Sequence, residues 1–483
     1  MTRGRFVVHA HFYQPARLDP FTGVVPPEPS AAPFRDWTAR IDAECYRPNA
    51  QRGTLAQISY DLGPTLATWL EREDRPTHDR FVADSAGAIA QAYHHAILPL
   101  AAAHDRRTEI RWGLRDFELR FGRRSVGLWL PETAVDLATL RLLADEGVRF
   151  TILAPWQAAE VGIDTRRPYR IELGGGRSIV AVFYDGALSS SVSFEPTATS
   201  DADRFAKERV APRVTLPLPD GESPLVVVAT DGELYGHHQP FRDLFLQRLV
   251  APGGGIDRGF DVVDLHAITI EPADRPFRSM RIRERTSWSC HHGVLRWSAE
   301  CPDAPDGRWK GPLRAALERL AAAIDNETER AVRDLTGEPD PWAARDDYID
   351  VVAGVERPAR FSARWLGNDA PADHRRRFEN LMLAQRWRLA MFASDGWYWD
   401  DPIRPETGQV LRSAARAVRL VDGLMGTRLE DRLLADLALF TSPATGLDGA
   451  ALYSSALAAI GQPPSASAAA AVRSRRGMVR RTA

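Results

Sequence analysis

Residues 225–231 read Leu-Val-Val-Val-Ala-Thr-Asp, an unbroken apolar run that ends in a carboxylate. Such a run is typical of a strand that is buried on both faces of a parallel sheet. Similar runs occur at 5–11, 125–130, 150–154, 178–184 and 260–265. Amphipathic helical patterns at 136–146 and 240–250 lie between them. Strands that alternate with helices predict an α/β fold in which helices cover the sheet.

Helical patterns replace the strand patterns in the second half of the chain. From about residue 315, apolar residues recur at helical spacing in 313–325, 375–393, 407–424 and 429–440. The stretch 463–483 is rich in Ala and Ser and carries five Arg, which is typical of a disordered tail. We therefore predict a barrel-type catalytic domain over 1–310, a mainly α-helical domain over 311–462 and a disordered basic tail over 463–483.

Composition and charge exclude several classes of protein. The 483 residues include 62 Lys and Arg against 64 Asp and Glu, so a net charge of -2 gives no attraction to nucleic acid. Cys45, Cys290 and Cys301 are too few for a disulfide framework and favour a reducing compartment, the cytoplasm. His9 and His11 interrupt the apolar start, so we expect no signal peptide, and no run is long enough for a transmembrane helix.

Polar side chains gather where the predicted strands end. His9 and His11 close the first strand, and Glu132, Asp185 and Asp231 each follow a later one. The carboxyl ends of parallel strands meet at one mouth, so these residues should share a ligand site. Two facing carboxylates with different pKa values are the minimum for glycoside chemistry, which indicates Glu132 and Asp231. The alternative is that each carboxylate caps the helix that follows it.

Four segments resemble, in order, the motifs of glycoside hydrolase family 57. Residues 9–15 (His-Ala-His-Phe-Tyr-Gln-Pro) are similar to the first motif, and 93–100 (Tyr-His-His-Ala-Ile-Leu-Pro-Leu) to the second. Residues 127–132 (Gly-Leu-Trp-Leu-Pro-Glu) resemble the nucleophile motif, and 230–237 (Thr-Asp-Gly-Glu-Leu-Tyr-Gly-His) the acid/base motif. Further segments resemble the branch in which a helical domain of unknown function follows the barrel: 36–37, 44–49, 287–291 and 395–400.

The resemblance implies an incomplete (β/α)7 barrel and a retaining glycoside hydrolase or glucanotransferase. The substrate would be an α-linked glucan of the starch or glycogen type, with α-1,4 bonds favoured and no cofactor or catalytic metal. Glu132 would be the nucleophile and Asp231 the acid/base, with their carboxyl groups about 5–5.5 Å apart. Together with the strand-end positions, the resemblance nominates a set of substrate-binding residues: His11, Gln14, His95, Trp129, Trp156, Asp185, Glu233, His237 and Trp288.

Two positions depart from the family pattern. The first motif usually joins His, Gln and Pro directly, whereas Phe12 and Tyr13 separate His11 from Gln14 here. After Gly-His the family tends to carry a tryptophan, and this chain has His238. The two departures lie beside the residues that the resemblance assigns to sugar binding, His11, Gln14 and His237.

A metal-dependent hydrolase is the main alternative. His9 and His11 point to the same face of a strand, because side chains alternate with a period of two. Barrel amidohydrolases and deacetylases hold a divalent ion in this way, and Asp185 or Asp231 would be a further ligand. An inactive carbohydrate-binding protein is a second alternative, although such a protein has no need of the pair Glu132 and Asp231.

A separate group of metal-type residues lies at Cys290, His291 and His292, with Cys301 nearby. Their spacing follows no regular zinc-finger pattern. The group is interpreted either as a structural metal site or as buried, reduced thiols. Gly174-Gly175-Gly176 lacks the Lys and Ser/Thr of a phosphate loop and predicts a hairpin turn instead.

Overall fold

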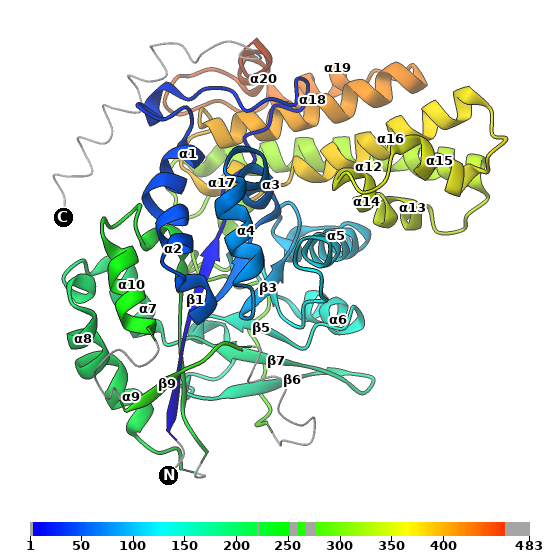
Figure 1. Cartoon of the computed structure of the whole chain (residues 1–483). Coiled ribbons are helices and arrows are strands. Elements are labelled where there is room, and N and C mark those ends of the chain that lie inside the picture. The colour runs from blue at the N-terminus through cyan, green and yellow to red at the C-terminus, as the bar shows by residue number, and fades with distance from the viewer. Residues whose placement is uncertain (1–2, 220–221, 252–258, 266–276, 459–483) are drawn as a thin grey trace.

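The computed structural model describes residues 3–219, 222–251, 259–265 and 277–458. The first half of the chain forms a strand-and-helix domain, and long helices from the second half lie across one end of it (Figure 1). Among the described residues, no helix combines the length and the apolar character needed to cross a membrane. The predicted tail at 463–483 lies outside the described residues.

Strand β1 (Gly4–Phe12) is the centre of a parallel sheet. Its neighbours are β2 (Ser59–Leu62) on one side and β8 (Leu225–Asp231) on the other. The sheet continues from β2 to β3 (Ala88–Gln91) and β4 (Leu128–Trp129), and β9 (Phe260–Val262) pairs with the start of β1. All these pairings are parallel, so the carboxyl ends of the strands meet at one edge.

A smaller sheet extends the barrel. Strand β5 (Phe150–Leu153) pairs in parallel with β7 (Arg177–Phe183), and an isolated bridge between Gly127 and Phe150 joins β5 to the main sheet. The Asp185 N–H donates to Val227 O over 2.7 Å, which brings the end of β7 to β8. In the described part of the chain, the path β8-β1-β2-β3-β4-β5-β7 therefore runs through seven parallel strands. This confirms the predicted incomplete barrel.

The barrel is wrapped by helices from its own half of the chain (Figure 1). The predicted helices at 136–146 and 240–250 are present as α6 (Leu137–Asp145) and α10 (Arg242–Val250). The others are α1 (Trp37–Ile41), α2 (Arg47–Gln51), α3 (Pro64–Glu73), α4 (Arg75–Ala83), α5 (Ala103–Phe121), α7 (Gly186–Phe194), α8 (Ala202–Phe205) and α9 (Ala211–Thr215).

The second half is helical, as predicted. Three long helices, α12 (Lys310–Thr336), α16 (Ala372–Ala390) and α18 (Pro405–Met425), form its body. The shorter ones are α13 (Pro341–Asp347), α14 (Ile349–Val352), α15 (Pro358–Leu366), α17 (Asp395–Tyr398), α19 (Leu429–Leu437) and α20 (Gly449–Ala458). The boundary that we placed after residue 310 stays a prediction.

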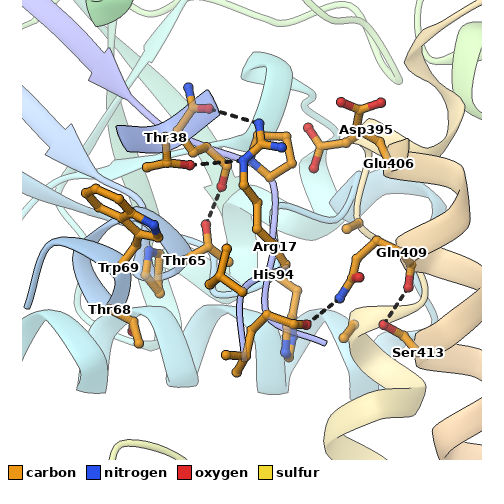
Figure 2. Close-up of a pocket in the computed structure, with 18 of the residues that line it drawn as sticks. Arg17, Thr38, Thr65, Thr68, Trp69, His94, Asp395, Glu406, Gln409 and Ser413 are labelled. Carbon is orange, nitrogen blue, oxygen red and sulfur yellow. Dashed lines mark hydrogen bonds between the residues drawn. The ribbon is translucent and has the colours of Figure 1, made fainter. Parts of the chain in front are cut away.

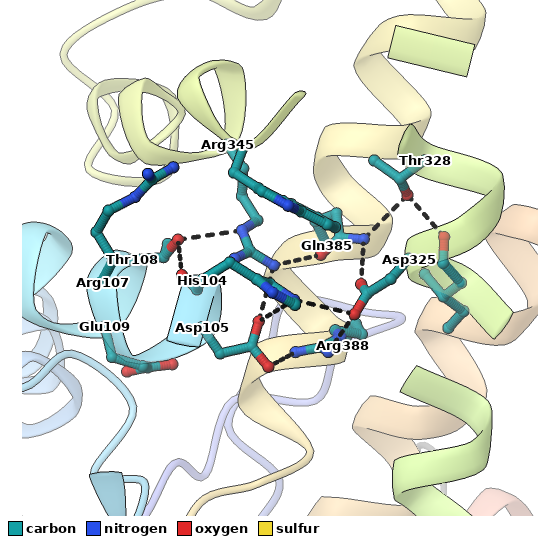
Figure 3. A network of polar contacts seen from close by, with 12 residues as sticks. His104, Asp105, Arg107, Thr108, Glu109, Asp325, Thr328, Arg345, Gln385 and Arg388 are labelled. Carbon is teal, nitrogen blue, oxygen red and sulfur yellow. Dashed lines mark hydrogen bonds and ion pairs between the residues drawn. The ribbon is translucent and has the colours of Figure 1, made fainter. Parts of the chain in front are cut away.

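A buried network of charged side chains joins the two halves (Figure 3). Asp105 on α5 accepts hydrogen bonds from Arg345 Nη1 over 2.9 Å and from Arg388. Arg388 also pairs with Asp325 on α12. Burial would raise the pKa of Asp325, but the charges of Arg388 and Arg345 and the hydrogen bonds from His104 and Gln385 together outweigh burial, and the pKa is about 2. The two guanidinium groups balance both carboxylates, so the helices are fixed on the barrel by charge as well as by apolar packing.

Three strands were not predicted from the sequence. β2 (Ser-Tyr-Asp-Leu) and β3 (Ala-Ile-Ala-Gln) are short and include polar residues and alanines, so they give no clear β-branched apolar run. β6 (Pro168–Gly174) forms an antiparallel hairpin with β7, and the turn is Gly174–Gly176, as predicted. All three glycines have positive φ values, which other residues rarely adopt.

Candidate active site

Glu132 lies in a strained turn directly after β4. Glu132 and Thr133 have φ values of 56° and 49°, in the left-handed region. This conformation costs a non-glycine residue about 1–3 kcal/mol and concentrates at functional sites. The backbone N–H of Trp288 donates to Glu132 O over 3.0 Å, and the Thr133 hydroxyl donates to Gln157 Oε1 over 2.9 Å. These contacts hold the strained turn in place.

Two donors contact the Glu132 carboxylate. Trp288 Nε1–H donates to Oε2 over 3.0 Å, and the Ser289 hydroxyl donates to the same oxygen. The pKa of Glu132 is raised overall, because burial and the charge of Asp231 outweigh the two donors and the positive charge of His11, which lower it. The donors thus favour the ionised form that a nucleophile requires.

Asp231 is the last residue of β8 and pairs with His11 across the ladder between β1 and β8. It is exposed, yet the protein atoms around its carboxyl raise the pKa by desolvation, against the opposing charges of His11 and His238. Within the described residues, no hydrogen-bond donor contacts this carboxylate. Asp231 is therefore better placed than Glu132 to keep a proton.

The helix-capping alternative is wrong for both carboxylates. Helix α6 is capped by Asp136, whose Oδ1 accepts from Thr139 N over 2.7 Å. Asp231 precedes the one-turn helix Gly232–Leu234 and makes no capping hydrogen bond with its side chain. Phe241 occupies the cap position of α10. Glu132 and Asp231 are therefore free of this structural role.

Asp61 is a buried carboxylate that our sequence analysis missed. It lies on β2 between two imidazoles: Oδ1 is 3.1 Å from His9 Nε2, and Oδ2 is 2.8 Å from His11 Nδ1. Burial would lower the pKa of His11, but the Asp61 charge and hydrogen bond raise it to about 9. His11 therefore carries a positive charge at neutral pH. The strand-end rule would have found Asp61 if the short strand β2 had been recognised.

His95 extends this chain of polar groups toward the helical half. Its Nε2 lies 3.3 Å from His11 Nε2, and its Nδ1 lies 2.7 Å from Ser394 Oγ. Burial and the charge of His11 hold the pKa of His95 well below its usual value, so this ring is neutral. His11 then donates to His95 Nε2, and His95 Nδ1–H donates to Ser394. The Tyr13 ring stacks on His95 with 3.9 Å between ring centres.

The helical half also brings acidic and phenolic groups to the site. The Tyr13 hydroxyl donates to Asp395 Oδ2 over 2.5 Å, and burial raises the pKa of Asp395 to about 7. Burial and the charges of Glu132 and Asp231 raise the pKa of Tyr398 to about 12. Segment 394–398 therefore faces the two carboxylates. Its sequence had been noted, but not as part of the site.

Glu233 lies beside Asp231 as expected from the acid/base motif. Its Oε1 accepts from the Tyr46 hydroxyl over 2.5 Å and from the Tyr13 backbone N–H over 3.3 Å. Burial and the charge of Asp231 raise the pKa of Glu233 to about 7. Near neutral pH this side chain is therefore close to the midpoint of its titration.

A cavity of about 190 Å³ lies next to this site, between the loop after β1 and the helices α3 and α18 (Figure 2). Tyr13 and Asp395 line it, so it adjoins the polar site. Gln14 also lines it, and Arg17 Nε donates to Thr38 Oγ1 over 3.0 Å at its wall. The loop that separates His11 from Gln14 thus forms one side of the cavity.

The structure gives two predicted binding residues other roles. Trp129 is fully buried, and the His9 and His11 rings both stack on it, with ring centres 5.0 and 4.9 Å away. Its faces are covered, so it cannot stack on a sugar. Asp185 caps α7 by accepting from Leu188 N over 2.9 Å, and its second oxygen accepts from Arg213 Nε over 2.8 Å.

Other predicted binding residues remain accessible. Trp156 is 43% exposed, and its indole N–H donates to Ser287 O over 3.0 Å, next to the loop that holds Glu132. Trp288 is half-buried. His237 is half-buried and its Nδ1 lies 2.5 Å from Glu44 Oε2, so its ring is fixed by a residue of the 44–49 segment.

The geometry disfavours a metal ion on His9 and His11. His9 uses Nδ1 toward Ser59 Oγ (3.1 Å) and Nε2 toward Asp61, while His11 uses Nδ1 toward Asp61 and Nε2 toward His95. A metal ligand needs a free lone pair on one ring nitrogen. All four nitrogens have protein partners, so no open coordination position remains between the rings.

Comparisons with known proteins identify two matching family models along the chain. Residues 84–252 match the model of glycosyl hydrolase family 57, and residues 306–475 match a domain of unknown function, DUF3536. No curated protein sequence matches the chain.

Solved structures share the fold at low sequence identity. An exo-type maltose-forming amylase from Pyrococcus sp. ST04 superposes with a TM-score of 0.70 at 14% identity, covering 94% of this chain and 88% of that one. A family 57 branching enzyme from Thermococcus kodakaraensis gives 0.59 at 16% identity, with 94% of each chain covered. A 4-alpha-glucanotransferase from Thermococcus litoralis gives 0.56 at 15% identity, covering 87% of this chain and 60% of that one.

Proposed function

Because the chain belongs to glycosyl hydrolase family 57, we propose that it cleaves or transfers α-linked glucan chains with retention of configuration. The observation that carries this proposal is the contrast between two carboxylates at the carboxyl ends of β4 and β8. Glu132 receives two hydrogen bonds, and Asp231 receives none from the described residues. Such a contrast separates a nucleophile from a proton donor.

The proposed reaction has two steps. Glu132 attacks the anomeric carbon, the glycosidic C–O bond breaks, and Asp231 gives its proton to the departing oxygen. A water molecule or a sugar hydroxyl then attacks the same carbon, passes its proton to Asp231 and releases Glu132. His11 supports both steps because its positive charge lies near both carboxylates.

We assign substrate contacts to the predicted residues that stay accessible or face the site. Trp156 and Trp288 offer aromatic surface to a sugar ring, while Gln14, Glu233 and His237 offer polar groups. The ring nitrogens of His11 and His95 already have protein partners, so we assign these two residues to positioning and charge instead. Trp129 and Asp185 are left out because their partners lie within the protein. The cavity of Figure 2 adjoins Tyr13 and Gln14, which supports a role for it in holding a neighbouring glucose unit.

The substrate class rests on the family and on the similar structures. Their printed names are those of an amylase, a branching enzyme and a glucanotransferase, all of which concern α-glucans. Whether the acceptor is water or a sugar hydroxyl depends on how well the site excludes water. The three free cysteines support a reducing, cytoplasmic environment for this activity.

The test compares wild type with Glu132→Gln and Asp231→Asn on amylose, glycogen and maltooligosaccharides. Reducing ends and the distribution of chain lengths are followed together, since a rise in reducing ends means hydrolysis and redistribution without a rise means transfer. Each variant should lose activity by about 10³-fold or more while keeping its unfolding temperature. Full activity in either variant, or no action of the wild type on any α-glucan, would contradict the proposal.

A further inference from the structure

Four side chains outside the proposed active site converge on one point. The Cys290 and Cys301 Sγ atoms are 3.5 Å apart, and Cys301 Sγ lies 3.6 Å from His292 Nδ1. His292 Nδ1 lies 3.3 Å from Asp303 Oδ2. One ligand atom from each of the four residues lies within 4.8 Å of all the others. The sequence had offered both His291 and His292 and left Asp303 unnoticed, and the fold selects His292.

These separations fit the edges of a tetrahedron around zinc. Zn–S bonds of about 2.3 Å and Zn–N or Zn–O bonds of about 2.0–2.1 Å give edges of about 3.8 Å for S···S, 3.5 Å for S···N and 3.3 Å for N···O. The observed distances are 3.5, 3.6 and 3.3 Å. Two thiolates with one imidazole and one carboxylate are also a ligand set that selects zinc over harder cations.

The surroundings suit a bound metal thiolate. Cys290 Sγ accepts hydrogen bonds from the backbone N–H groups of His292 and Arg296. The backbone N–H of His291 donates to Asp303 Oδ2 over 2.8 Å, which orients that carboxylate. Such supporting hydrogen bonds orient the ligands in metal sites.

A buried cation completes the charge balance. Lys310 is fully buried, its ammonium interacts electrostatically with Cys301 and Cys290, and it has no hydrogen-bond partner in the described part of the chain. Zn²⁺ with two thiolates and one carboxylate carries a net charge of -1, and one ammonium neutralises it. Beside two neutral thiols the ammonium would keep the charge of Asp400 but would lack the negative charge of the two sulfurs.

A disulfide explains the cluster less well. An S–S bond is about 2.05 Å long, so sulfur atoms 3.5 Å apart are not bonded. A disulfide also gives no reason for His292 and Asp303 to meet at the same point. The second group of metal-type residues, His104, Asp105 and Asp325, is already compensated by Arg345 and Arg388 in the network of Figure 3.

We propose that Cys290, His292, Cys301 and Asp303 bind one structural Zn²⁺ ion. Binding displaces the two thiol protons, and the ion closes the loop 290–303. The residues immediately before this loop are Trp288 and Ser289, which donate to Glu132. The ion therefore anchors the segment that orients the proposed nucleophile. Only this link to Glu132 rests on the proposed function; the zinc site itself does not.

The test begins with the metal content of the full-length chain, purified under reducing conditions without chelator. We expect about one zinc per chain, as for other structural sites of this kind. After zinc removal, Co²⁺ should restore binding and give the intense visible bands of tetrahedral cobalt together with a thiolate-to-cobalt charge-transfer band. Absence of zinc and of these bands would overturn the proposal, whatever the enzyme activity is.

Paired variants locate the site. His292→Ala should bind zinc at least tenfold more weakly, whereas His291→Ala should keep one zinc, because the His291 side chain is exposed and lies outside the ligand set. Cys301→Ser should lose the charge-transfer band, and Cys45→Ser should keep it, since Cys45 is buried elsewhere with its Sγ donating to Gly232 O. Equal zinc loss in both members of a pair would contradict the assignment.

A measurement on the wild type tests the site even if the variants fail to fold. Zinc should protect Cys290 and Cys301 from alkylation, and chelation should expose both at the same rate, as read by peptide mass. If the two cysteines are instead found as a disulfide in the reduced preparation, or are alkylated equally with and without zinc, the proposal is wrong.

Discussion

Trp288 donates to Glu132 twice: its backbone N–H reaches Glu132 O over 3.0 Å, and its indole N–H reaches Oε2 over 3.0 Å. One residue thus fixes both the strained backbone and the carboxylate of the proposed nucleophile. The two positions are 156 residues apart in the chain, so only the fold brings them together.

Trp288→Phe should shift the acidic limb of the activity profile to higher pH. The indole donor stabilises the Glu132 anion, so its removal raises the pKa of Glu132 by about one unit, and kcat should fall about tenfold. The measurement is kcat/KM against pH on a maltooligosaccharide. Trp156→Phe is the control, because the Trp156 indole donates to Ser287 O and not to a carboxylate. The acidic limb of its pH profile should therefore stay where it is in the wild type. A limb that moves to lower pH in Trp288→Phe would contradict the assignment.

Asp61→Asn should weaken activity at alkaline pH. Asp61 keeps His11 charged, with a pKa of about 9, and the neutral amide should let that pKa fall toward 6.5 or below. The positive charge of His11 is then lost above about pH 7. The alkaline limb of the pH–activity profile should therefore move to lower pH by at least one pH unit. Imidazole NMR titration checks this directly.

Ser59→Ala is the matched control for Asp61→Asn. It removes a hydrogen bond from His9 but leaves the pair formed by Asp61 and His11. The same alkaline shift in both variants would mean that any disturbance of the hydrogen bonds around His9 lowers the His11 pKa, and that the Asp61 charge is not its specific cause.

Ser394→Ala tests whether the helical half contributes to the reaction. The hydroxyl accepts from His95 Nδ1, so its loss removes the partner that fixes the tautomer of His95. We expect kcat to fall about fivefold to tenfold, which corresponds to about 1 kcal/mol for one hydrogen bond. Ser362→Ala removes a hydroxyl elsewhere in the helical half, where it bonds Glu379 Oε1, and should leave kcat unchanged. Equal kcat values for Ser394→Ala and wild type would mean that the helical half does not contribute to the reaction through Ser394.

Arg388→Met should destabilise the whole chain. It leaves Asp105 and Asp325 buried without their main counter-charge, which costs about 3–5 kcal/mol of unfolding free energy. Arg419→Met breaks an exposed pair with Glu430 and should cost at most about 1 kcal/mol. Denaturant unfolding at pH 7 compares the two. Similar costs would show that the network does not hold the halves together.

The same network gives a pH dependence with a defined sign. The pKa of Asp325 is about 2 in the folded chain, below its ordinary value of about 3.9. Its contribution to stability is therefore complete above about pH 4 and is lost as the pH falls toward 2. Arg388→Met should lose this acid-side dependence, because the carboxylate then no longer has a depressed pKa.

The predictions from sequence succeeded where a long pattern was present. The apolar run at 225–231 and the helical periodicity after residue 315 each extend over enough residues to fix an element type. Strand β2 reads Ser-Tyr-Asp-Leu, which has two polar residues and no β-branched one, so β2 was missed, and with it Asp61. Trp129 was assigned to the substrate because sequence gives a residue type but not which faces of its ring are covered.

The sequence by itself determined the barrel, the helical second half and the positions of Glu132 and Asp231 at strand ends, because periodicity and strand alternation are local properties. Tertiary structure alone decided which groups share a charge environment. Asp61 keeps His11 protonated. Trp288 and Ser289 stabilise the Glu132 anion, and segment 394–398 closes the site from the other half of the chain. The physical reason is that electrostatic and hydrogen-bonding interactions act over a few ångströms in space, whatever the separation along the chain.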